Sequence, residues 1–313
     1  MRAVTIVDGR LAVRQHPDPV PSGGELLVRV RAAGLNGADL AQVRGHYPAP
    51  PGSPPDIPGL ELAGEVVAVG PGVTRFRPGD RVMSLVGGGG QAELALVHER
   101  VAMPVPDGVA WPAAGGFPEV FTTAHDALFT QCGLSLGDRV LVHGAAGGVG
   151  TAAVQLAAAA GARVVASVRN PDHHQAVASL GADQVVLPDA LEATGPFDII
   201  LELVGAPNLP RNLELLASGG RIMVIGLGAG AVVQMNLGML LARRARLLGS
   251  TLRARPLEQK AEAARRVEAQ VLPGLASGRL RVPVAATYPL EAAQTAYEHF
   301  AAGGKLGKIV LEP

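Results

Sequence analysis

A run of glycines within residues 139–157, RVLVHGAAGGVGTAAVQLA, carries the strongest chemical signal in the chain. The glycines stand at 144, 147, 148 and 150, after a strand-like run and before a helix-like one. A pyrophosphate can approach a backbone closely only where side chains are missing, and a helix N-terminus offers it free N–H groups and a positive dipole end. An ordinary strand–helix turn is the alternative, but a second strand about 20 residues later favours a dinucleotide site. Gly150 would then let the helix pack tightly on the sheet. The residues predicted to contact the cofactor in this turn are Ala146, Gly147, Gly148 and Val149.

The end of that second strand indicates which dinucleotide binds. It reads VVASVRNPDHH over residues 164–174, with no acid before Asp172. An NAD-specific site places an acid there to hold the ribose 2′-hydroxyl. A carboxylate would repel a 2′-phosphate, whereas an arginine can bind one through two parallel hydrogen bonds. Ser167 and Arg169 therefore predict NADPH as the cofactor, and a solvated loop role for Arg169 is the alternative.

Alternating strands and helices must position these residues. Strands that alternate with helices at short spacing form a parallel sheet covered on both faces. From about residue 128 the pattern predicts strands at 139–143, 163–166, 184–187, 198–203 and 221–226, with helices at 150–160 and 171–180. Residues 1–118 instead carry strand-like runs between Gly- and Pro-rich turns, which indicates a mainly β domain. These runs are 2–7, 25–33, 62–70 and 92–97; a helix is expected at 257–275, and 309–311 returns to strand.

Composition excludes several classes of function. The 313 residues include 27 basic and 27 acidic side chains, so the chain lacks the positive charge of a nucleic-acid or membrane-surface binder. One cysteine cannot form an internal disulfide or a cysteine-based zinc cluster. The N-terminus lacks the pattern of a signal peptide, and the most apolar stretch, 149–168, is interrupted by polar residues. We therefore expect a soluble, cytoplasmic protein of roughly two domains.

Several motifs, in order along the chain, resemble the medium-chain dehydrogenase/reductase superfamily. The similarity is greatest to its zinc-free, zeta-crystallin-like quinone oxidoreductases, particularly the tumour-suppressor-inducible subgroup. The motifs are GLNGADLAQVRGHYPAPPG (34–52), PGLELAGEVVAVGPGV (58–73), GDRVMSLVGGGGQAELALV (79–97), HGAAGGVGTAAVQLA (143–157), LGAD (180–183), GSTLRARPLEQK (249–260) and GKIVLE (307–312).

This resemblance implies an α/β fold with nested domains. A Rossmann domain with a doubly wound parallel sheet, residues 119–260, would be inserted into a GroES-like, mainly β substrate domain built from 1–118 and 261–313. A cleft between the domains would bring the nicotinamide to the substrate. The family also implies a homodimer that pairs through an edge strand at 247–251.

The zinc ligands of the alcohol-dehydrogenase relatives are missing. Asn36-Gly37-Ala38-Asp39 stands at the first ligand site, and Gly59-Leu60-Glu61 at the usual Gly-His-Glu. The four-cysteine lobe is also absent, and adjacent histidines at 173 and 174 on a helix would point apart. Since zinc needs three or four converging ligands, we predict no metal site.

The resemblance further implies residues at the reaction site. Asn36 could donate its amide N–H to an acceptor carbonyl, and Tyr47 could hydrogen-bond to or protonate the reduced oxygen. A turn residue and a proline-braced surface ring are the respective alternatives. Lys308 matches a position near the cofactor, with a solvated charge as the equal alternative. The further cofactor contacts implied by the family and by the strand ends are Thr123, Val204, Gly226, Leu227, Thr251, Leu252, Arg253 and Lys308.

Together these residues predict an NADPH-dependent, zinc-independent quinone oxidoreductase. Without a metal to stabilise an alkoxide, hydride must be delivered to an electron-poor acceptor such as a quinone or a conjugated carbonyl. The family's usual 2′-phosphate lysine is replaced by His173, so the preference for NADPH depends on Arg169. Two alternatives stay open: a reductase of enals, enones or enoyl thioesters, and an NADPH-binding protein without catalysis. The expected partner is a small-molecule substrate, with no nucleic acid and no membrane.

Overall fold

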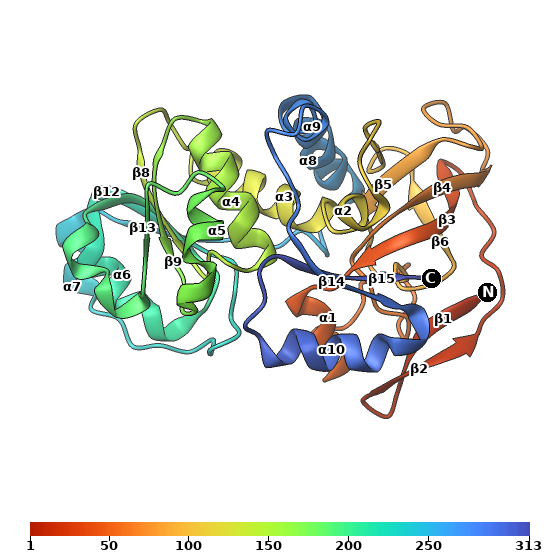
Figure 1. The fold of residues 1–313 in the computed structure, drawn as a ribbon, viewed down its shortest axis with the longest axis horizontal. Helices are drawn as coiled ribbons and strands as arrows, with labels where there is room; N and C mark the ends of the chain where they lie inside the picture. The colour runs from red at the N-terminus through yellow and green to blue at the C-terminus, as the bar shows by residue number, and fades with distance from the viewer. The chain divides into compact units, whose positions relative to one another are not determined.

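Two stretches that are far apart in the chain build one unit of the fold (Figure 1). In the computed structural model, which describes residues 1–313, Met1–Thr122 and Leu252–Pro313 form the first unit, and Thr123–Thr251 form the second. The arrangement is nested, as the sequence predicts, and the units divide at 122/123 and 251/252, beside the expected 118/119 and 260/261. Glu119 donates its backbone N–H to the Glu61 carboxylate at 2.8 Å, and Arg253 donates to the carbonyl of Gly87, also at 2.8 Å. These bonds tie residues 119–122 and 252–260 to the first unit.

The second unit is built on a six-stranded sheet in which all strands run parallel. In sheet order the strands are β10 (Gln184–Val186), β9 (Arg163–Ser167), β8 (Arg139–His143), β11 (Phe197–Glu202), β12 (Leu216–Val224) and β13 (Arg246–Gly249). The chain therefore winds outward from β8 in one direction and returns to β11 for the other. This is the order of a doubly wound Rossmann sheet, whose ligand crevice lies at the carboxyl ends where the order reverses.

Helices cover both faces of this sheet, because each parallel crossover is right-handed and the winding direction changes after β10. Figure 1 shows α4 and α5 to one side of the sheet and α6 and α7 to the other. Their bounds are Gly148–Ala159 for α4, His174–Ala178 for α5, Leu209–Leu215 for α6 and Leu237–Arg243 for α7. The strands supply the buried core with Leu141, Val165, Phe197, Ile200 and Ile222.

The first unit contains a seven-stranded sheet completed by strands from both stretches of chain. In order these are β14 (Val284–Pro289), β15 (Lys308–Glu312), β3 (Glu25–Gly34), β4 (Glu61–Val69), β5 (Arg81–Leu85) and β7 (Met103–Pro104), with β6 (Leu94–His98) pairing with β3. A hairpin of β1 (Arg2–Val7) and β2 (Arg10–Gln15) stands beside it. Because β15 lies between β14 and β3, the later stretch of chain is built into the sheet. This is the GroES-like part of the fold.

Short helices complete the first unit: α1 (Gly37–Val43), α2 (Trp111–Gly115), α8 (Leu257–Gln270), α9 (Leu272–Ala276) and α10 (Ala293–Ala302). A further helix, α3 (Pro118–His125), crosses the boundary between the units. The helix expected at 257–275 is two helices, because Pro273 lies in the first turn of α9 and has no N–H to continue α8. No helix of the chain has the length and apolar character needed to cross a membrane.

Candidate active site

The glycine turn follows β8 and leads directly into α4, as the sequence predicts. Gly147 caps the helix, and Gly148 and Val149 begin it, so their N–H groups belong to its unpaired first turn. A side chain at Gly150 would collide with the carbonyl oxygen of Gly144, which confirms that close packing requires a glycine there. The turn therefore offers the open backbone that a pyrophosphate needs.

The carboxyl end of β9 carries the two residues predicted to select the cofactor. Ser167 is buried and Arg169 is exposed. The carbonyl of Ser167 accepts a hydrogen bond from the backbone of Ala145 at 3.2 Å, so this strand end is joined to the glycine turn. Asn170 caps the next turn by accepting from the Asp172 N–H at 3.1 Å. Arg169 is an exposed cation at the strand end, and no acid stands between β9 and Asp172.

The remaining predicted contacts of the second unit also follow strand ends. Val204 comes after β11, Gly226 and the exposed Leu227 come after β12, and Thr251 comes after β13. The turns are joined, since Ala229 donates its N–H to the carbonyl of Val204 at 2.9 Å. Thr123 is buried in α3, at the start of the unit. Apart from Thr123, the predicted residues of this unit all lie at or just after the carboxyl ends of its parallel strands.

In the first unit, Asn36, Glu61 and Lys308 form a buried polar cluster. The Lys308 ammonium lies 2.7 Å from Glu61 Oε1 and donates to Asn36 Oδ1 at 2.7 Å and to the Leu35 carbonyl at 2.6 Å. Its side chain is 3% exposed and that of Glu61 is 0% exposed. The alternative of a solvated charge at Lys308 is therefore wrong. Three donor hydrogens meet three oxygens, which satisfies the ammonium completely.

The predicted donor role of Asn36 needs correction. Its Nδ2 donates to Glu61 Oε1 at 3.0 Å and to the Gly34 carbonyl at 3.3 Å. Since an amide nitrogen has two hydrogens, neither remains for an acceptor carbonyl. Asn36 instead joins Lys308 to Glu61 and begins α1 as its N-cap.

Asp39 is a second buried acid beside this cluster, bonded to the backbone of Asn36. Its carboxylate accepts from the Asn36 N–H at 2.8 Å and from the Gly59 N–H at 3.1 Å. The side chain is fully buried, and burial raises its pKa to about 6 against the lowering effect of these bonds and of the charges on Lys308 and Arg253. Asp39 was not among the predicted site residues, although an acid three residues after an N-cap asparagine is a sequence signal for such a bond.

Arg253 belongs to the first unit, where its guanidinium serves the fold. It donates to the carbonyls of Gly87 at 2.8 Å and Tyr47 at 2.9 Å and to Gln42 Oε1 at 2.6 Å. The guanidinium also stacks on the half-buried Tyr47 ring, 5.0 Å from its centroid. Burial lowers the pKa of Arg253. These bonds fix the loop that carries Tyr47; the neighbouring Leu252 is buried, and cofactor contacts for both residues stay predictions.

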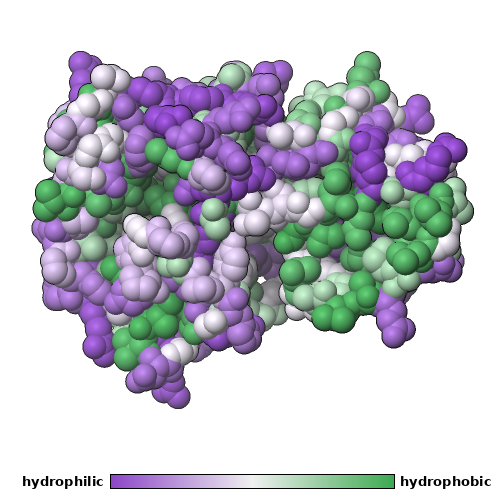
Figure 2. All heavy atoms as spheres, turned by 180° about the vertical axis from the view of Figure 1, so that it is seen from behind, coloured by the Kyte–Doolittle hydropathy of each residue, from purple (hydrophilic) through white to green (hydrophobic).

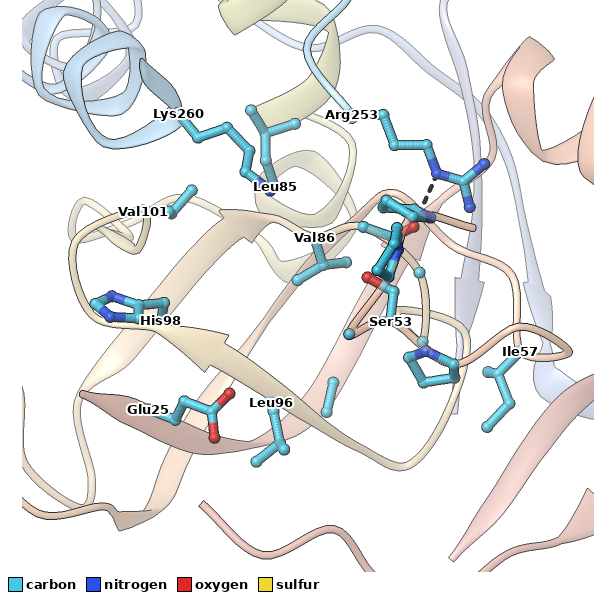
Figure 3. Close-up of a pocket in the computed structure, with 18 of the residues that line it drawn as sticks. Glu25, Ser53, Ile57, Leu85, Val86, Leu96, His98, Val101, Arg253 and Lys260 are labelled. Atoms are coloured by element: carbon cyan, nitrogen blue, oxygen red, sulfur yellow. Dashed lines mark hydrogen bonds between the residues drawn. The ribbon is translucent and has the colours of Figure 1, made fainter. Parts of the chain in front are cut away.

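A cavity of about 570 Å³ opens beside the Arg253–Gly87 bond (Figure 3). Its walls come from the proline-rich loop 50–54, the segment 85–89, strand β6 and the residues 253–260. Lys260, from α8, lines the cavity together with Leu85, and burial lowers the pKa of Lys260 (Figure 3). Neither Asn36 nor Tyr47 lines this cavity. The structure therefore does not bring the two predicted catalytic residues into it.

One buried carboxylate in the second unit escaped prediction. Glu202 ends β11 and accepts hydrogen bonds on both oxygens, from the backbone of Val204 and Gly205 and from Asn212. The sequence signal was an acid near the end of the predicted strand 198–203, just before Gly205. His143, the last residue of β8, contacts Asn212 Oδ1 at 2.8 Å.

Comparison with known proteins gives matches along most of the chain. The alcohol dehydrogenase GroES-like domain model matches residues 22–107, and the zinc-binding dehydrogenase model matches 148–269. The chain is 31% identical to quinone oxidoreductase of Rattus norvegicus, over 99% of this chain and 97% of the relative. It is 32% identical to acryloyl-coenzyme A reductase of Metallosphaera sedula, over 96% and 95%. Among solved structures, mycobacterial Rv1454c complexed with NADPH has a TM-score of 0.89 at 29% identity, covering both chains completely.

The zinc implied by one of these model names does not fit the residues present. Both oxygens of Glu61 are engaged, Oε1 by Lys308 and Asn36 and Oε2 by the Glu119 N–H. A cation in contact with that carboxylate would have to displace a lysine that is already there. Across residues 1–313, no three His, Cys, Asp or Glu side chains converge as a zinc shell requires.

Proposed function

Because the chain belongs to the medium-chain dehydrogenase/reductase superfamily, in its quinone oxidoreductase branch, we propose that it is an NADPH-dependent reductase of quinones. The proposal of a metal-free reaction rests on the ion pair between Glu61 and Lys308. The ion pair puts an internal cation against the one carboxylate that remains of the expected metal ligands. Without a metal to stabilise an alkoxide, we propose zinc-independent hydride delivery to an acceptor that is already electron-poor.

The choice of NADPH rests on the end of β9. Arg169 is exposed there, and no acid before Asp172 stands at the strand end to hold a ribose 2′-hydroxyl. A guanidinium can hold a 2′-phosphate through two charge-assisted hydrogen bonds. The NADPH complex of the mycobacterial neighbour supports a nicotinamide cofactor in this fold.

The residues of the chain would act chiefly by holding and orienting. NADPH, when bound, supplies the hydride. The glycine turn 144–150 would hold the pyrophosphate, and the turns after β11 and β12 would hold the nicotinamide half. We propose that the Tyr47 hydroxyl donates a hydrogen bond to the reduced oxygen, with Asn36 as a positioning residue. Such a transfer depends mainly on proximity and orientation, so Tyr47 need not be essential.

The acceptor class is tested by following NADPH oxidation across ortho-quinones, para-quinones, enals and enoyl thioesters. We expect the highest kcat/KM for quinones. A preference for thioesters above about a hundredfold would overturn the quinone assignment. No turnover of any acceptor by a protein that binds NADPH would instead favour a non-catalytic binding protein.

Cofactor selection is tested separately with Arg169→Ala. Loss of the two charge-assisted bonds should raise KM for NADPH about tenfold or more while changing KM for NADH little. Arg163→Ala is a matched control, because Arg163 is an exposed arginine at the other end of β9. Equal losses for NADPH and NADH in Arg169→Ala would contradict the assignment of this residue to the 2′-phosphate.

A second candidate function is the reduction of an enoyl thioester. The 32% identity with acryloyl-coenzyme A reductase over 96% of the chain favours it. The two functions share a zinc-free site and differ in the acceptor, so the same acceptor screen separates them.

We also propose a homodimer and a cytoplasmic location. Strand β13 is at the edge of its sheet, which leaves one side open for pairing with a second copy. Figure 2 shows a broad apolar area on the second unit. The exposed apolar side chains in β13 and in the stretch that leads from β12 to it are Leu227, Val232, Leu237, Leu241 and Leu247. Sedimentation velocity should give a dimer, and a monomer at all concentrations would rule the dimer out. The proposed cytoplasmic location rests on the single cysteine, which fits a reducing compartment.

A further inference from the structure

Glu202 is a buried acid at the point where the sheet of the second unit changes its winding direction. It ends β11, which pairs with β8, and its side chain is 0% exposed. The two strands on either side of this switch point lead into the turns that would hold the cofactor. A buried carboxylate is costly unless hydrogen bonds satisfy it.

The carboxylate is bonded to the turn that follows its own strand. Oε1 accepts from the N–H groups of Val204 at 2.7 Å and Gly205 at 2.8 Å, and from Asn208 Nδ2 at 3.3 Å. The backbone carbonyl of Glu202 accepts from Ile225 and Gly226, which begin the turn after β12. One residue therefore binds the turns at two neighbouring strand ends.

The second oxygen extends this bonding to the end of β8. Oε2 accepts from Asn212 Nδ2 at 2.8 Å, and Asn212 Oδ1 lies 2.8 Å from His143 Nε2. His143 is the last residue of β8, directly before the glycine turn. All three side chains are buried, with exposed fractions of 0% for Glu202, 0% for Asn212 and 4% for His143.

The hydrogen bonds from His143 through Asn212 to Glu202 can run in one donor-to-acceptor direction only. Because Asn212 must give an N–H to the carboxylate, its oxygen faces His143, which must then donate from Nε2. Burial lowers the pKa of His143, which favours the neutral ring, and the bond to Asn212 Oδ1 puts its hydrogen on Nε2. Charge-assisted bonds to a buried carboxylate are stronger than neutral ones, which makes this an effective clamp.

We propose that Glu202 is a positioning residue for the cofactor: its carboxylate holds the turn after β11 directly and the end of β8 through Asn212 and His143, and its backbone carbonyl holds the turn after β12. The inference rests on the proposed NADPH-dependent function and concerns the nicotinamide half of the cofactor. In a doubly wound sheet each half binds one mononucleotide, and Arg169 belongs to the β8–β10 half. The turns after β11 and β12 therefore serve the other half.

Glu202→Gln tests this on the full-length protein. The amide keeps the size of the side chain but replaces the charge-assisted bonds to Val204 and Gly205 with neutral ones. We expect the Kd for NADPH to rise about tenfold, equivalent to about 1.4 kcal/mol. The Kd for adenosine 2′,5′-bisphosphate, which lacks the nicotinamide half, should change less than about twofold.

A nuclear magnetic resonance signature accompanies this change. A glutamine would present N–H groups to Asn212, which must then turn its amide over and offer N–H to His143. We expect ¹⁵N spectra to show the His143 hydrogen on Nε2 in the wild type and on Nδ1 in Glu202→Gln, with His143→Gln assigning the signal. An Nδ1 hydrogen in the wild type would overturn the proposed direction of the bonds.

Asp198→Asn is the matched control. Asp198 lies on the same strand at the opposite edge, where its carboxylate accepts from the Arg139 N–H at 2.8 Å. The Asp198→Asn variant should be less stable, but its Kd values for NADPH and for the bisphosphate should stay within about twofold of the wild type. If Glu202→Gln does not fold, Asn212→Ala takes its place, since it cuts the link to β8 and keeps the bonds to Val204 and Gly205.

The outcomes separate the inference from the proposed function. A wild-type protein that binds neither NADPH nor NADH would end both. Wild-type NADPH affinity in Glu202→Gln, or equal losses for NADPH and the bisphosphate, would overturn the positioning role alone.

Discussion

Lys308 completes a buried cluster by supplying as many N–H groups as there are oxygens to accept them. Glu61, Asn36 and the Leu35 carbonyl receive all three, and no water is needed. Breaking a buried pair is far more damaging than replacing it, because the remaining charge is left without compensation. The cluster therefore behaves as a unit in which each member depends on the other two.

We expect Lys308→Met to lower the free energy of unfolding by about 3–5 kcal/mol, since it leaves Glu61 charged and buried. Urea unfolding followed by circular dichroism measures this. Arg31→Met is the control, because it breaks the exposed Arg31–Glu65 pair (2.9 Å) and should cost less than about 1 kcal/mol. The double variant Glu61→Leu/Lys308→Met should recover much of the loss; no recovery would show that the lysine acts by packing alone.

The raised pKa of Asp39 predicts how the free energy of unfolding depends on pH. Its pKa rises on folding from 3.8 to about 6, so the folded state binds more protons than the unfolded state between those values. Stability from this group is therefore present at low pH and is lost as pH rises through about 6. The unfolding free energy of the wild type minus that of Asp39→Asn should fall between about pH 4 and pH 6, by at most about 1.4 kcal/mol per pH unit. A difference that is flat or rises over this range would refute the assignment.

At the scale of the elements, two glycines at the junction of β8 and α4, Gly147 and Gly150, have different roles. A side chain at Gly150 would meet the Gly144 carbonyl and the Ala145 backbone, whereas one at Gly147 would lie 3.3 Å from the Gly144 oxygen. Backbone atoms cannot move aside as a flexible side chain can. Gly150 therefore serves the packing of helix on sheet, and Gly147 faces the open side of the turn.

Gly150→Ala should lower the free energy of unfolding by about 1–3 kcal/mol, because it overpacks a rigid junction. Gly147→Ala should cost less than about 1 kcal/mol, the usual range for an N-cap change. Both should weaken NADPH binding, Gly147→Ala by blocking the approach of the pyrophosphate. Thermal melts and fluorescence titration provide the two readouts. Equal destabilisation in both variants would contradict the separation of roles.

Local patterns predicted many of the strands and the glycine turn between β8 and α4 well, because both depend on residues close in sequence. The strand at 139–143 has the observed bounds of β8. By contrast, β12 begins at Leu216, five residues before the predicted start, since Gly219 and Gly220 interrupt the apolar pattern. The Lys308–Asn36 bond joins positions 272 apart, and no local pattern connects them. Only the sheet, which places β15 beside β3, brings that lysine to its acid.

On the scale of the whole molecule, no sheet is shared between the units, and the chain passes between the units at 122/123 and 251/252. All six strands of the second unit lie within one continuous stretch. A probe located in that stretch can therefore report on the unfolding of the second unit. Cys132 is such a probe, since it is the only cysteine and is buried there.

Burial raises the pKa of the Cys132 thiol to about 11, so about one thiol in a thousand is ionised at pH 8. We expect Ellman's reagent to react about a hundredfold more slowly with the native protein than with the unfolded chain. Added urea should raise the rate in step with loss of the second unit. Cys132→Ser/Ser135→Cys is the control, because position 135 is exposed and should react at the unfolded rate. Native Cys132 reacting as fast as that control would contradict the burial of the thiol.

The place of β15 in the first sheet also matters while the chain is being made. A ribosome releases Glu61 long before Lys308, and the whole of Thr123–Thr251 emerges between them. The nascent second unit has every strand it needs as soon as it is released, whereas the first must wait with the end of β3 unpaired. Until residue 308 appears, Glu61 has no cation and must stay hydrated. The first unit is therefore the last to close, and an interrupted synthesis would leave an open sheet edge exposed to other chains.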